Sequence, residues 1–497
     1  MKILFVYPQF PVTFWGFKYA LKFISKKAAS PPLGLLTVAA MLPEDWEKRF
    51  IDMNTTRLKD KHIKWADYVF ISGMALQRES AKALIERCKK LGVKTVAGGP
   101  LFTTEYQSFD DIDHLILGEV EDIMPQFIND LGNGKPLHIY QQKDFPDITK
   151  APIPLWKIVN KRKYSLMSIQ YSRGCPFDCE FCSVTALNGH KPRTKTREQI
   201  INELNALYNW GWRDAVFFVD DNFIGNKKKL KEEVLPAIIK WMSERRYPFT
   251  FSTQCSINLS DDNELMDLMV KAGFQTVFIG IETPNEASLN ECGKKGNMGR
   301  DLVENIKNIQ SHGIEVQAGF ILGFDNDPES IFVRLAEFIQ NTGISTAMVG
   351  LLNAGRGSKL FQRLKSEGRL LKETSGDNTD FSINFVPKMD YKTLINGYKK
   401  VLANIYSPKQ YYERAKRFLR EFNPPRLRPV YFRFIHLKAF FRSIWYLGIV
   451  GKERLYFWRL FFWTLVKRPT LFPTAVTISI QGYHFRRVCE NRNKFIS

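Results

Sequence analysis

The sequence predicts an α/β protein with two successive series of parallel strands, followed by a helical C-terminal region. Within residues 1–140, and again within residues 161–385, short apolar runs alternate with segments of helical periodicity. That alternation is typical of a parallel sheet covered by helices on both faces. The proline-rich residues 141–160 are interpreted as a linker. From residue 386 onward the sequence is helical, aromatic and basic, which indicates a separate C-terminal domain over 386–497.

The first series predicts a Rossmann-like sheet. Its apolar runs lie at residues 2–8, 50–54, 67–73, 94–99 and 114–119. Ligands of such sheets bind beyond the carboxyl ends of the strands. The candidate binding residues at these ends are Tyr7, Pro8, Gln9, Ser72, Gly73, Gly98, Gly99, Gly118 and Glu119. Turn formation alone is an equally good explanation of the glycines and the proline. No G-x-G-x-x-G follows the first strand, which argues against a dinucleotide.

The second series predicts a partial barrel of the TIM type. Six strands are expected, at residues 165–172, 215–221, 249–256, 276–283, 315–324 and 346–352, with helical stretches between them. Six β/α units make a (β/α)6 barrel, shorter than the eight-unit form, and barrel chemistry lies at the carboxyl ends of the strands.

Three of the seven cysteines, Cys175, Cys179 and Cys182, lie within eight residues, directly after the first barrel strand. An odd count with one tight group argues against a secreted disulfide framework and favours metal binding in a reducing compartment. Three thiolates can bind three irons of a 4Fe–4S cluster and leave the fourth iron open. Structural zinc needs a fourth ligand, and the spacing to His190 matches no zinc-finger pattern. Zinc, or three buried inert cysteines, are the weaker alternatives.

The spacing C-x3-C-x2-C, with the aromatic Phe181 before the last cysteine, is identified as the signature of the radical S-adenosylmethionine (radical SAM) family. The first sheet, with SPPLGLLTVAAMLP at residues 30–43, resembles the cobalamin-binding domain that precedes the barrel in one large subgroup. A narrower subgroup, which includes hopanoid 2-methylases, is similar in PRTKTREQ, FFVDDNFIGNKKK, FIGIETPNEASL, GFILGFDND and the terminal QGYHFRR.

The resemblance implies three cofactors: a 4Fe–4S cluster on Cys175, Cys179 and Cys182, S-adenosylmethionine, and cobalamin. One electron from the cluster would cleave S-adenosylmethionine and start radical chemistry. The further cofactor-binding residues that the resemblance implies are Phe181, Asp220, Asp221, Asn222, Thr253, Gln254, Glu282, Gly323 and Asp325. For some of them the alternative is that they only cap the following helix.

The sequence departs from its relatives at three places. Gln254 stands where similar proteins often carry a carboxylate, and residues 353–358 replace a Pro-Gly-Thr turn. The first domain also lacks the D-x-H-x-x-G pattern of proteins that bind cobalt through histidine. We therefore expect no histidine ligand to cobalt from the first loop.

The positive charge is concentrated near the C-terminus. The net charge is +21, and residues 401–497 contain 19 Lys and Arg against 4 Asp and Glu, with aromatic residues between them. This region is interpreted as a helical cap on the barrel, a surface for anionic membranes, or a nucleic-acid site. The absence of an RNA-binding motif disfavours nucleic acid. No apolar stretch is long enough to span a bilayer, and the N-terminus lacks signal-peptide anatomy. We expect a cytoplasmic protein with peripheral contact at the inner face of the membrane.

The predicted function is cobalamin-dependent methyl transfer to an unactivated carbon of a hydrophobic substrate, such as a lipid or an isoprenoid. The expected partners are that substrate and an electron donor such as flavodoxin or ferredoxin. Radical cyclisation or rearrangement without methyl transfer is the first alternative, and a non-catalytic metal-dependent binding module is the second. RNA methylthiolation usually requires a second cysteine cluster, whereas Cys88 is the only cysteine before Cys175.

Overall fold

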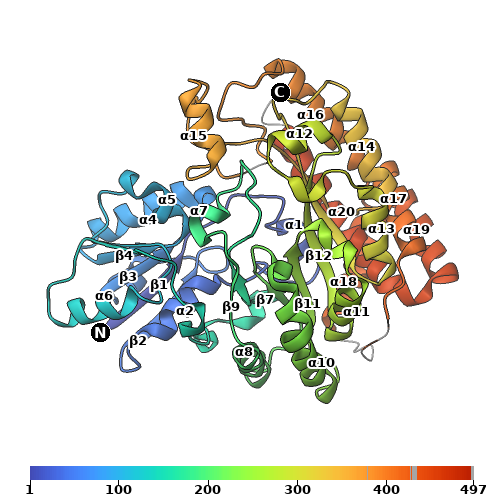
Figure 1. Cartoon of the computed structure of the whole chain (residues 1–497). Coiled ribbons are helices and arrows are strands. Elements are labelled where there is room, and N and C mark those ends of the chain that lie inside the picture. The colour runs from blue at the N-terminus through green and yellow to red at the C-terminus, as the bar shows by residue number, and fades with distance from the viewer. Residues whose placement is uncertain (378, 426, 428–433, 494–497) are drawn as a thin grey trace.

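The chain folds into two parallel sheets and a group of C-terminal helices (Figure 1). The computed structural model describes residues 1–377, 379–425, 427 and 434–493. The first sheet stands at the N-terminal side, the partial barrel lies in the middle, and the C-terminal helices pack along the far side of the barrel. The predicted α/β class, with a Rossmann-like domain, a partial barrel and a helical C-terminus, is confirmed.

The first sheet is parallel and has the order β2-β1-β3-β4-β5-β6. Its strands are β1 (Lys2–Tyr7), β2 (Glu47–Asp52), β3 (Tyr68–Ser72), β4 (Lys94–Gly98), β5 (His114–Leu117) and β6 (Ile139–Gln141). The helices α2 (Leu33–Met41) and α6 (Met124–Gly132) cover one face, and α4 (Arg78–Lys90) and α5 (Pro100–Glu105) cover the other. The order reverses between β1 and β3, and ligands of such sheets bind beside this switch point.

All five predicted strands of this sheet are present, and β6 is an addition. Sequence reasoning missed β6 because it has only three residues and a single buried side chain, Tyr140. It also borders the proline-rich stretch that was interpreted as a linker.

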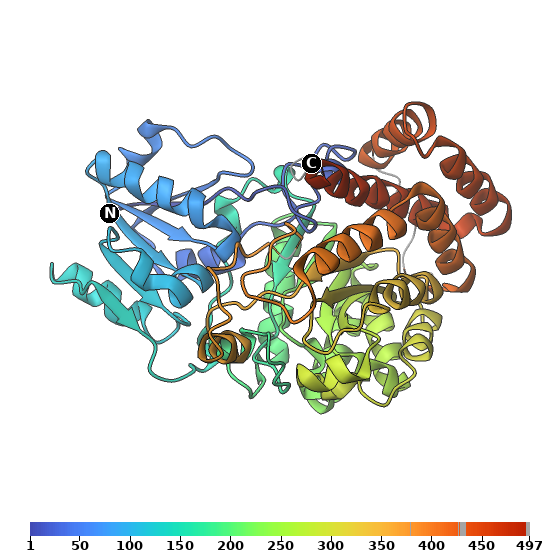
Figure 2. The ribbon, with the colours of Figure 1, turned by 90° about the horizontal axis from the view of Figure 1, so that it is seen from above.

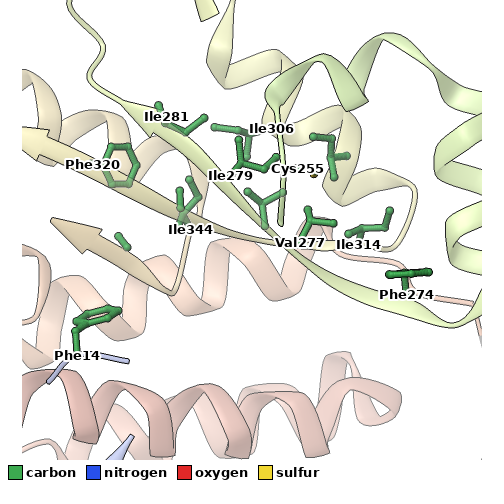
Figure 3. Packing of buried hydrophobic residues seen from close by; sticks show 14 of the residues in the cluster. Phe14, Cys255, Phe274, Val277, Ile279, Ile281, Ile306, Ile314, Phe320 and Ile344 are labelled. Atoms are coloured by element: carbon green, nitrogen blue, oxygen red, sulfur yellow. The ribbon is translucent and has the colours of Figure 1, made fainter. Parts of the chain in front are cut away.

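The barrel strands follow one another in sequence order around a second parallel sheet. They are β7 (Leu166–Ile169), β10 (Ala215–Phe218), β11 (Thr250–Cys255), β12 (Phe274–Glu282), β13 (Glu315–Leu322) and β14 (Ala347–Leu351), as predicted. The covering helices are α8 (Arg197–Asn209), α10 (Leu235–Glu244), α11 (Asn263–Ala272), α13 (Leu302–Ser311) and α14 (Ile331–Thr342). Figure 3 shows Val277, Ile279 and Ile281 of β12 on the side of Ile306 of α13. Alternate side chains of each strand thus pack on the helices, and the side chains between them face the lumen.

The barrel does not close, and other segments cover its two edge strands. The hydroxyls of Tyr398 and Tyr406, both in or beside α16 (Tyr391–Ile405), donate to the β14 carbonyls of Val349 (2.9 Å) and Ala347 (2.6 Å). On the other edge, the Leu166 N–H of β7 donates to the Ala29 carbonyl at 2.9 Å. Unpaired strand edges invite association with other chains, so both contacts protect the sheet.

The C-terminal helices pack along the open side of the barrel (Figure 2). They are α17 (Pro408–Glu421), α18 (Phe434–Ser443), the π-helical turn η10 (Ile444–Ile449), α19 (Arg454–Lys467) and α20 (Phe472–Asn493). A loop from the first domain, which contains α1 (Lys18–Leu21), reaches α20, where Phe14 stacks on Phe485 with ring centroids 4.2 Å apart. Within the described ranges, no helix combines the length and the apolar character needed to cross a membrane.

A buried histidine joins this loop to α20. The His484 side chain is fully buried; its Nε2 donates to the Phe14 carbonyl at 2.8 Å, and its Nδ1 accepts from the Tyr19 N–H at 3.3 Å. Both bonds require a neutral ring, and burial lowers the pKa of His484 to about 4.

This histidine predicts a loss of stability in mild acid. An unfolded histidine binds a proton near pH 6.5, whereas the folded one stays neutral until about pH 4. Unfolding therefore takes up a proton between these values, and the stabilisation present above pH 6.5 is lost as the pH falls toward 4. We expect wild type to lose roughly 2 kcal/mol more than His484→Gln between about pH 7 and pH 5. Denaturant unfolding at both pH values checks this, and equal losses in the two proteins would contradict it.

Candidate functional site

The three clustered cysteines lie on a loop at the carboxyl end of the barrel. The loop joins two short antiparallel strands, β8 (Ser172–Arg173) and β9 (Arg193–Thr194). All seven cysteines of the chain are free, and the three on the loop are partly buried. The Cys175 N–H donates to the Gly189 carbonyl at 3.1 Å, and the Cys182 N–H donates to the Cys179 carbonyl at 3.0 Å. These bonds hold the thiols at the end of the barrel where the sequence placed them.

Gly174 allows the loop to turn sharply before the first cysteine. Its φ is +95°, and a Cβ there would lie 2.8–3.0 Å from the carbonyl oxygens of Lys191, Asn188 and Gly189. The Asp221 carboxylate accepts hydrogen bonds from the Gly174 N–H and from the Asn188 amide, both at 2.9 Å. Asp221 therefore orients the cysteine loop from the end of the neighbouring strand.

The thiols share their surroundings with a buried ion pair. Burial raises the pKa of all three thiols, that of Cys182 to about 11, and the Lys294 ammonium opposes this rise. Lys294 lies 2.8 Å from Glu282. Although burial opposes its charge, Glu282 and the nearby thiols hold the pKa of Lys294 above its usual range. Iron binding displaces thiol protons. The Lys294 ammonium would then lie beside thiolates.

The three thiols are not gathered around a single point in the described structure. Among the described side chains, no three His, Cys, Asp or Glu groups converge on a point where one metal ion would sit. Thiolates that each bind a different iron of a cube need not converge in that way. The Val184 N–H points at Cys182 Sγ from 3.5 Å, a contact of the kind that tunes cluster potentials.

Several residues predicted to contact S-adenosylmethionine hold the strand ends in place. Asp220 is fully buried; its carboxylate accepts from the Tyr171 N–H at 3.2 Å and from the N–H and hydroxyl of Ser172, the hydroxyl at 2.6 Å. Burial raises the pKa of Asp220 to about 7. Asn222 bonds to Ser256, and the Thr253 hydroxyl donates to the Phe218 carbonyl. A contact of these residues with the cofactor stays a prediction.

The remaining predicted residues divide between the lumen and the outer rim. Glu282, at a β-bulge of β12 with φ +66°, reaches the thiols through Lys294. Gln254 lies in register with Phe278 on the neighbouring strand. Asp325, by contrast, is bound by Arg363 and Arg369 of the rim. The Gly323 N–H donates to Asp327, and the Phe181 ring lies 6.3 Å from the ring of Phe324.

A pocket of about 280 Å³ opens where the first sheet meets the barrel. Five of the nine candidate residues of the first domain line it: Ser72, Gly98, Gly99, Gly118 and Glu119. The others, Tyr7, Pro8, Gln9 and Gly73, do not, and the Pro8 carbonyl instead accepts from the Gln77 amide at 2.6 Å. A Cβ at Gly98 would lie 2.8 Å from the Ile116 carbonyl, and Gly99 has φ +88°. The two glycines therefore allow β5 and the Ser72 side chain to pack closely against this loop at the edge of the pocket.

An ion-pair network beside this pocket joins the first domain to the barrel. Arg173, next to the cysteine loop, lies 2.6 Å from Glu119 and 2.8 Å from Glu121 of the first domain, and Arg193 also pairs with Glu119. Sequence reasoning missed Arg173, Arg193 and Lys294. The position of Arg173 two residues before Cys175 was a usable signal, whereas Lys294 carries none, because it is more than a hundred residues from the cysteines.

Three family models match successive parts of the chain. The B12 binding domain matches residues 24–128, the Radical SAM superfamily matches residues 169–339, and a domain of unknown function, DUF4070, matches residues 358–496. The first two matches agree with the first sheet and the barrel.

Curated relatives align over nearly the full chain. An uncharacterized methyltransferase of Synechocystis sp. is 38% identical over 490 residues, which span 98% of this chain and 91% of that protein. The hopanoid C-2 methylase of Rhodopseudomonas palustris is 34% identical over 473 residues, 92% of this chain and 88% of that protein. Among solved structures, the cobalamin-dependent S-adenosylmethionine radical enzyme OxsB has the same fold, with a TM-score of 0.62 at 13% identity over 100% of this chain and 80% of that one.

The close approach at Gly174 predicts a large cost for a single methyl group. Gly134 is the matched control, because its φ is +70° but no atom lies within 4 Å of its Cβ position. Backbone strain alone should make Gly134→Ala cost about 1–2 kcal/mol of unfolding free energy. Gly174→Ala should cost at least about 3 kcal/mol, since the methyl group must also displace backbone carbonyls. Thermal unfolding of both variants checks this, and equal effects would show that the loop yields easily.

Proposed function

The chain belongs to the cobalamin-dependent radical SAM methyltransferases, and on this premise we propose that it methylates an unactivated carbon of a hydrophobic, lipid-like substrate. The observation that carries the proposal is the placement of three free thiols at the carboxyl end of the barrel, beside the glycine-lined pocket of the first domain. Arg173 links the two, since it adjoins the thiol loop and lines the pocket. The name of the hopanoid C-2 methylase supports a lipid-like substrate.

The proposal gives each part of the site a role. Cys175, Cys179 and Cys182 hold the 4Fe–4S cluster, and Gly98, Gly99 and Gly118 border the cobalamin. When bound, the cluster supplies the electron that cleaves S-adenosylmethionine, and cobalamin supplies the methyl group. We expect a flavodoxin or a ferredoxin to deliver electrons. We expect no histidine ligand to cobalt from the first loop.

The chain's own residues orient these groups and keep water out. Asp221 and Gly174 set the path of the thiol loop. Lys294 places a positive charge beside the thiolates and is itself held by Glu282. The first domain contacts the carboxyl end of the first barrel strand through Glu119 and Glu121, which pair with Arg173. A reactive radical needs shielding from water, and we propose that this contact contributes to it.

A labelled methyl group tests the proposed reaction. Full-length protein is reconstituted without oxygen with iron, sulfide and cobalamin, then incubated with a reductant, a neutral lipid extract and S-adenosylmethionine with a deuterated methyl group. We expect the label in an apolar lipid. Cys175→Ala should lower both cleavage of S-adenosylmethionine and labelling by more than about a hundredfold, because a missing thiolate prevents cluster assembly. Cys88→Ala, in the first-domain core, is the matched control and should retain both.

Two outcomes would decide against parts of the proposal. Cleavage that is unchanged in Cys175→Ala, Cys179→Ala and Cys182→Ala would remove the cluster assignment. Cleavage with no label in any product, together with a product of unchanged mass, would favour radical cyclisation or rearrangement.

We also propose that the C-terminal hairpin contacts an anionic membrane surface. The membrane-facing hairpin is defined as α18, η10 and α19 with the adjoining turn, residues 434–468. This hairpin has eleven exposed large hydrophobic side chains, as many as the whole of the rest of the described chain. They are Phe434, Leu437, Phe441, Trp445, Tyr446, Ile449, Val450, Leu455, Phe462, Leu465 and Val466. The hairpin, residues 434–468, also contains seven Lys and Arg but only one acidic residue, Glu453. Exposed apolar residues between basic ones are typical of interfacial helices.

Vesicle sedimentation tests this contact. Lys438, Lys452, Arg454 and Arg459 are exposed, whereas Arg442 bonds to the Phe23 carbonyl and Ser25 and is left unchanged. Each basic residue near an anionic surface contributes about 1 kcal/mol. Changing the four exposed residues to Gln should therefore weaken binding to phosphatidylglycerol vesicles by more than about tenfold, and salt should weaken wild-type binding.

The matched control removes the same charge from the outside of the barrel. It changes Lys228, Lys240, Lys271 and Lys307, all exposed on barrel helices, to Gln. We expect this variant to bind vesicles within about twofold of wild type, because a distant charge is screened beyond a Debye length. Equal weakening by both sets would indicate a nonspecific charge effect, and recovery of wild type in the supernatant at low salt would remove the proposal.

A further inference from the structure

A cavity of about 1340 Å³ lies at the amino end of the barrel strands, opposite the thiols. Ligand pockets usually measure about 300–1000 Å³, so this one is large. One wall is the lumen face of the sheet, with Ser252 of β11, Thr276 of β12 and Gln317 of β13. The other wall is the inner side of the C-terminal helices, with Phe440 of α18 and Val476 of α20.

The cavity exists because the barrel is open. In a closed barrel, layers of side chains from opposite strands fill the interior. Here six strands leave one side uncovered, and α18, α20 and the loop that carries Phe17 and Leu21 cover it. A helix is wider than a strand and directs only one stripe of side chains toward the sheet. These elements therefore cover the lumen without filling it.

The walls are apolar, with a few neutral polar groups. Phe17, Leu21, Phe440, Val476 and Ile480 supply the apolar surface. The Ser252 and Thr276 hydroxyls face the cavity, and neither has a hydrogen-bond partner among the described residues. The charged residues that line the cavity, Arg213, Asp214, Arg245 and Arg246, all belong to the turns before β10 and β11. Such a space favours a largely hydrocarbon body with one or two neutral oxygen groups, and it disfavours a carboxylate or a phosphate deep inside.

The turn before β11 is strained where it lines the cavity. Arg246 and Tyr247 are consecutive and both have positive φ, +56° and +54°. Neither is a glycine, so each conformation costs energy that the surrounding structure must offset. Strain of this kind concentrates at ligand sites. Here the strained turn forms part of the cavity wall.

The strand face that lines this cavity leads toward the thiols. Along the same face of β12, Thr276 is followed by Phe278, Gly280 and Glu282, and Glu282 holds Lys294 beside the cysteines. The Phe278 ring lies over Gly319, where a Cβ would be 2.8 Å from its Cζ, and Trp15 packs edge-on against it at 5.3 Å. Gly319 thus leaves room for the Phe278 ring, and Gly280 leaves room for the pair of Glu282 and Lys294.

The cavity also adjoins the membrane-facing hairpin. Leu437 of α18 lines the cavity and is 36% exposed, while Phe434 and Phe441, one turn away on either side, are exposed. One helix therefore presents apolar side chains both to the outside and to the cavity.

We propose that this cavity holds the apolar body of a neutral, largely hydrocarbon substrate, which enters beside α18 from the membrane surface and extends along the lumen toward the thiols. The inference rests on the proposed methyl transfer and deepens it, since it names the substrate class and the route. The reacting end of the substrate then lies near Phe278, and its body fills the space between the sheet and α20.

Binding of a neutral hydrocarbon probe tests the cavity without any turnover. Full-length protein is titrated with diphenylhexatriene, a rod-shaped hydrocarbon that fluoresces when removed from water. We expect saturable binding, and we expect Val476→Trp and Thr276→Phe each to weaken it by at least about tenfold, because added bulk occupies the cavity. Val333→Trp is the matched control, since Val333 is 62% exposed on α14 and away from the cavity, and it should bind within about twofold of wild type.

The outcomes separate this inference from the proposed function. Circular dichroism identifies a filling variant that has unfolded, in which case the other filling variant decides. Wild type that binds no probe, or filling variants that bind like wild type, would overturn the cavity assignment even if the labelled methyl group is transferred. Probe binding that the filling variants abolish would support it even if no methyl transfer is found, and only the reaction proposed above would then fail.

Discussion

The open side of the six-stranded barrel is the constraint on which the rest of the structure depends. A parallel sheet of this kind must be covered on both faces, and its two edge strands must be paired or protected. The chain meets both needs with segments from its two ends. The backbone of residues 27–29 forms hydrogen bonds with residues 163–166 at the start of β7. The hydroxyls of Tyr398 and Tyr406 donate hydrogen bonds to carbonyls of β14. The loop that carries Phe14 also meets α20, where Phe14 stacks on Phe485.

The carboxyl end of the barrel depends on a second constraint, which is electrostatic. Arg173, Arg193, Glu119 and Glu121 are largely buried at the contact between the first domain and the barrel. Burying charge is costly unless each group is paired, and breaking one buried pair leaves another charge uncompensated. The network therefore determines how the first domain sits on the barrel, and Arg173 transmits that position to the cysteine loop two residues away. The glycine-lined pocket and the thiols are held in one arrangement as a result.

The two ends of the lumen have different chemical characters. Toward the carboxyl end, buried carboxylates, Lys294 and the thiols make a polar region that suits ionic cofactors. Toward the amino end, aromatic and aliphatic side chains surround a large space. The proposed apolar substrate and the charged cofactors would thus approach one another from opposite ends of the same barrel. The C-terminal helices, which expose both basic and large hydrophobic side chains, adjoin the apolar end.

The sequence by itself determined the features that depend on neighbouring residues. Strand and helix periods predicted both sheets and the C-terminal helices, and the spacing of Cys175, Cys179 and Cys182 identified the thiol loop, because each pattern is local. Only the tertiary structure decided which long-range partners meet. It pairs Lys294 with Glu282 beside the thiols and directs Asp220 to the backbone of Tyr171 and Ser172, just after the first barrel strand. It also excludes Tyr7, Pro8 and Gln9 from the pocket that Gly98 and Gly99 line. It also creates the cavity from β11, β12, β13, α18 and α20, whose lining residues are up to 229 positions apart, from Ser252 to Gln481. Such contacts follow from the packing of whole elements, and no short-range pattern in the chain encodes which faces come together.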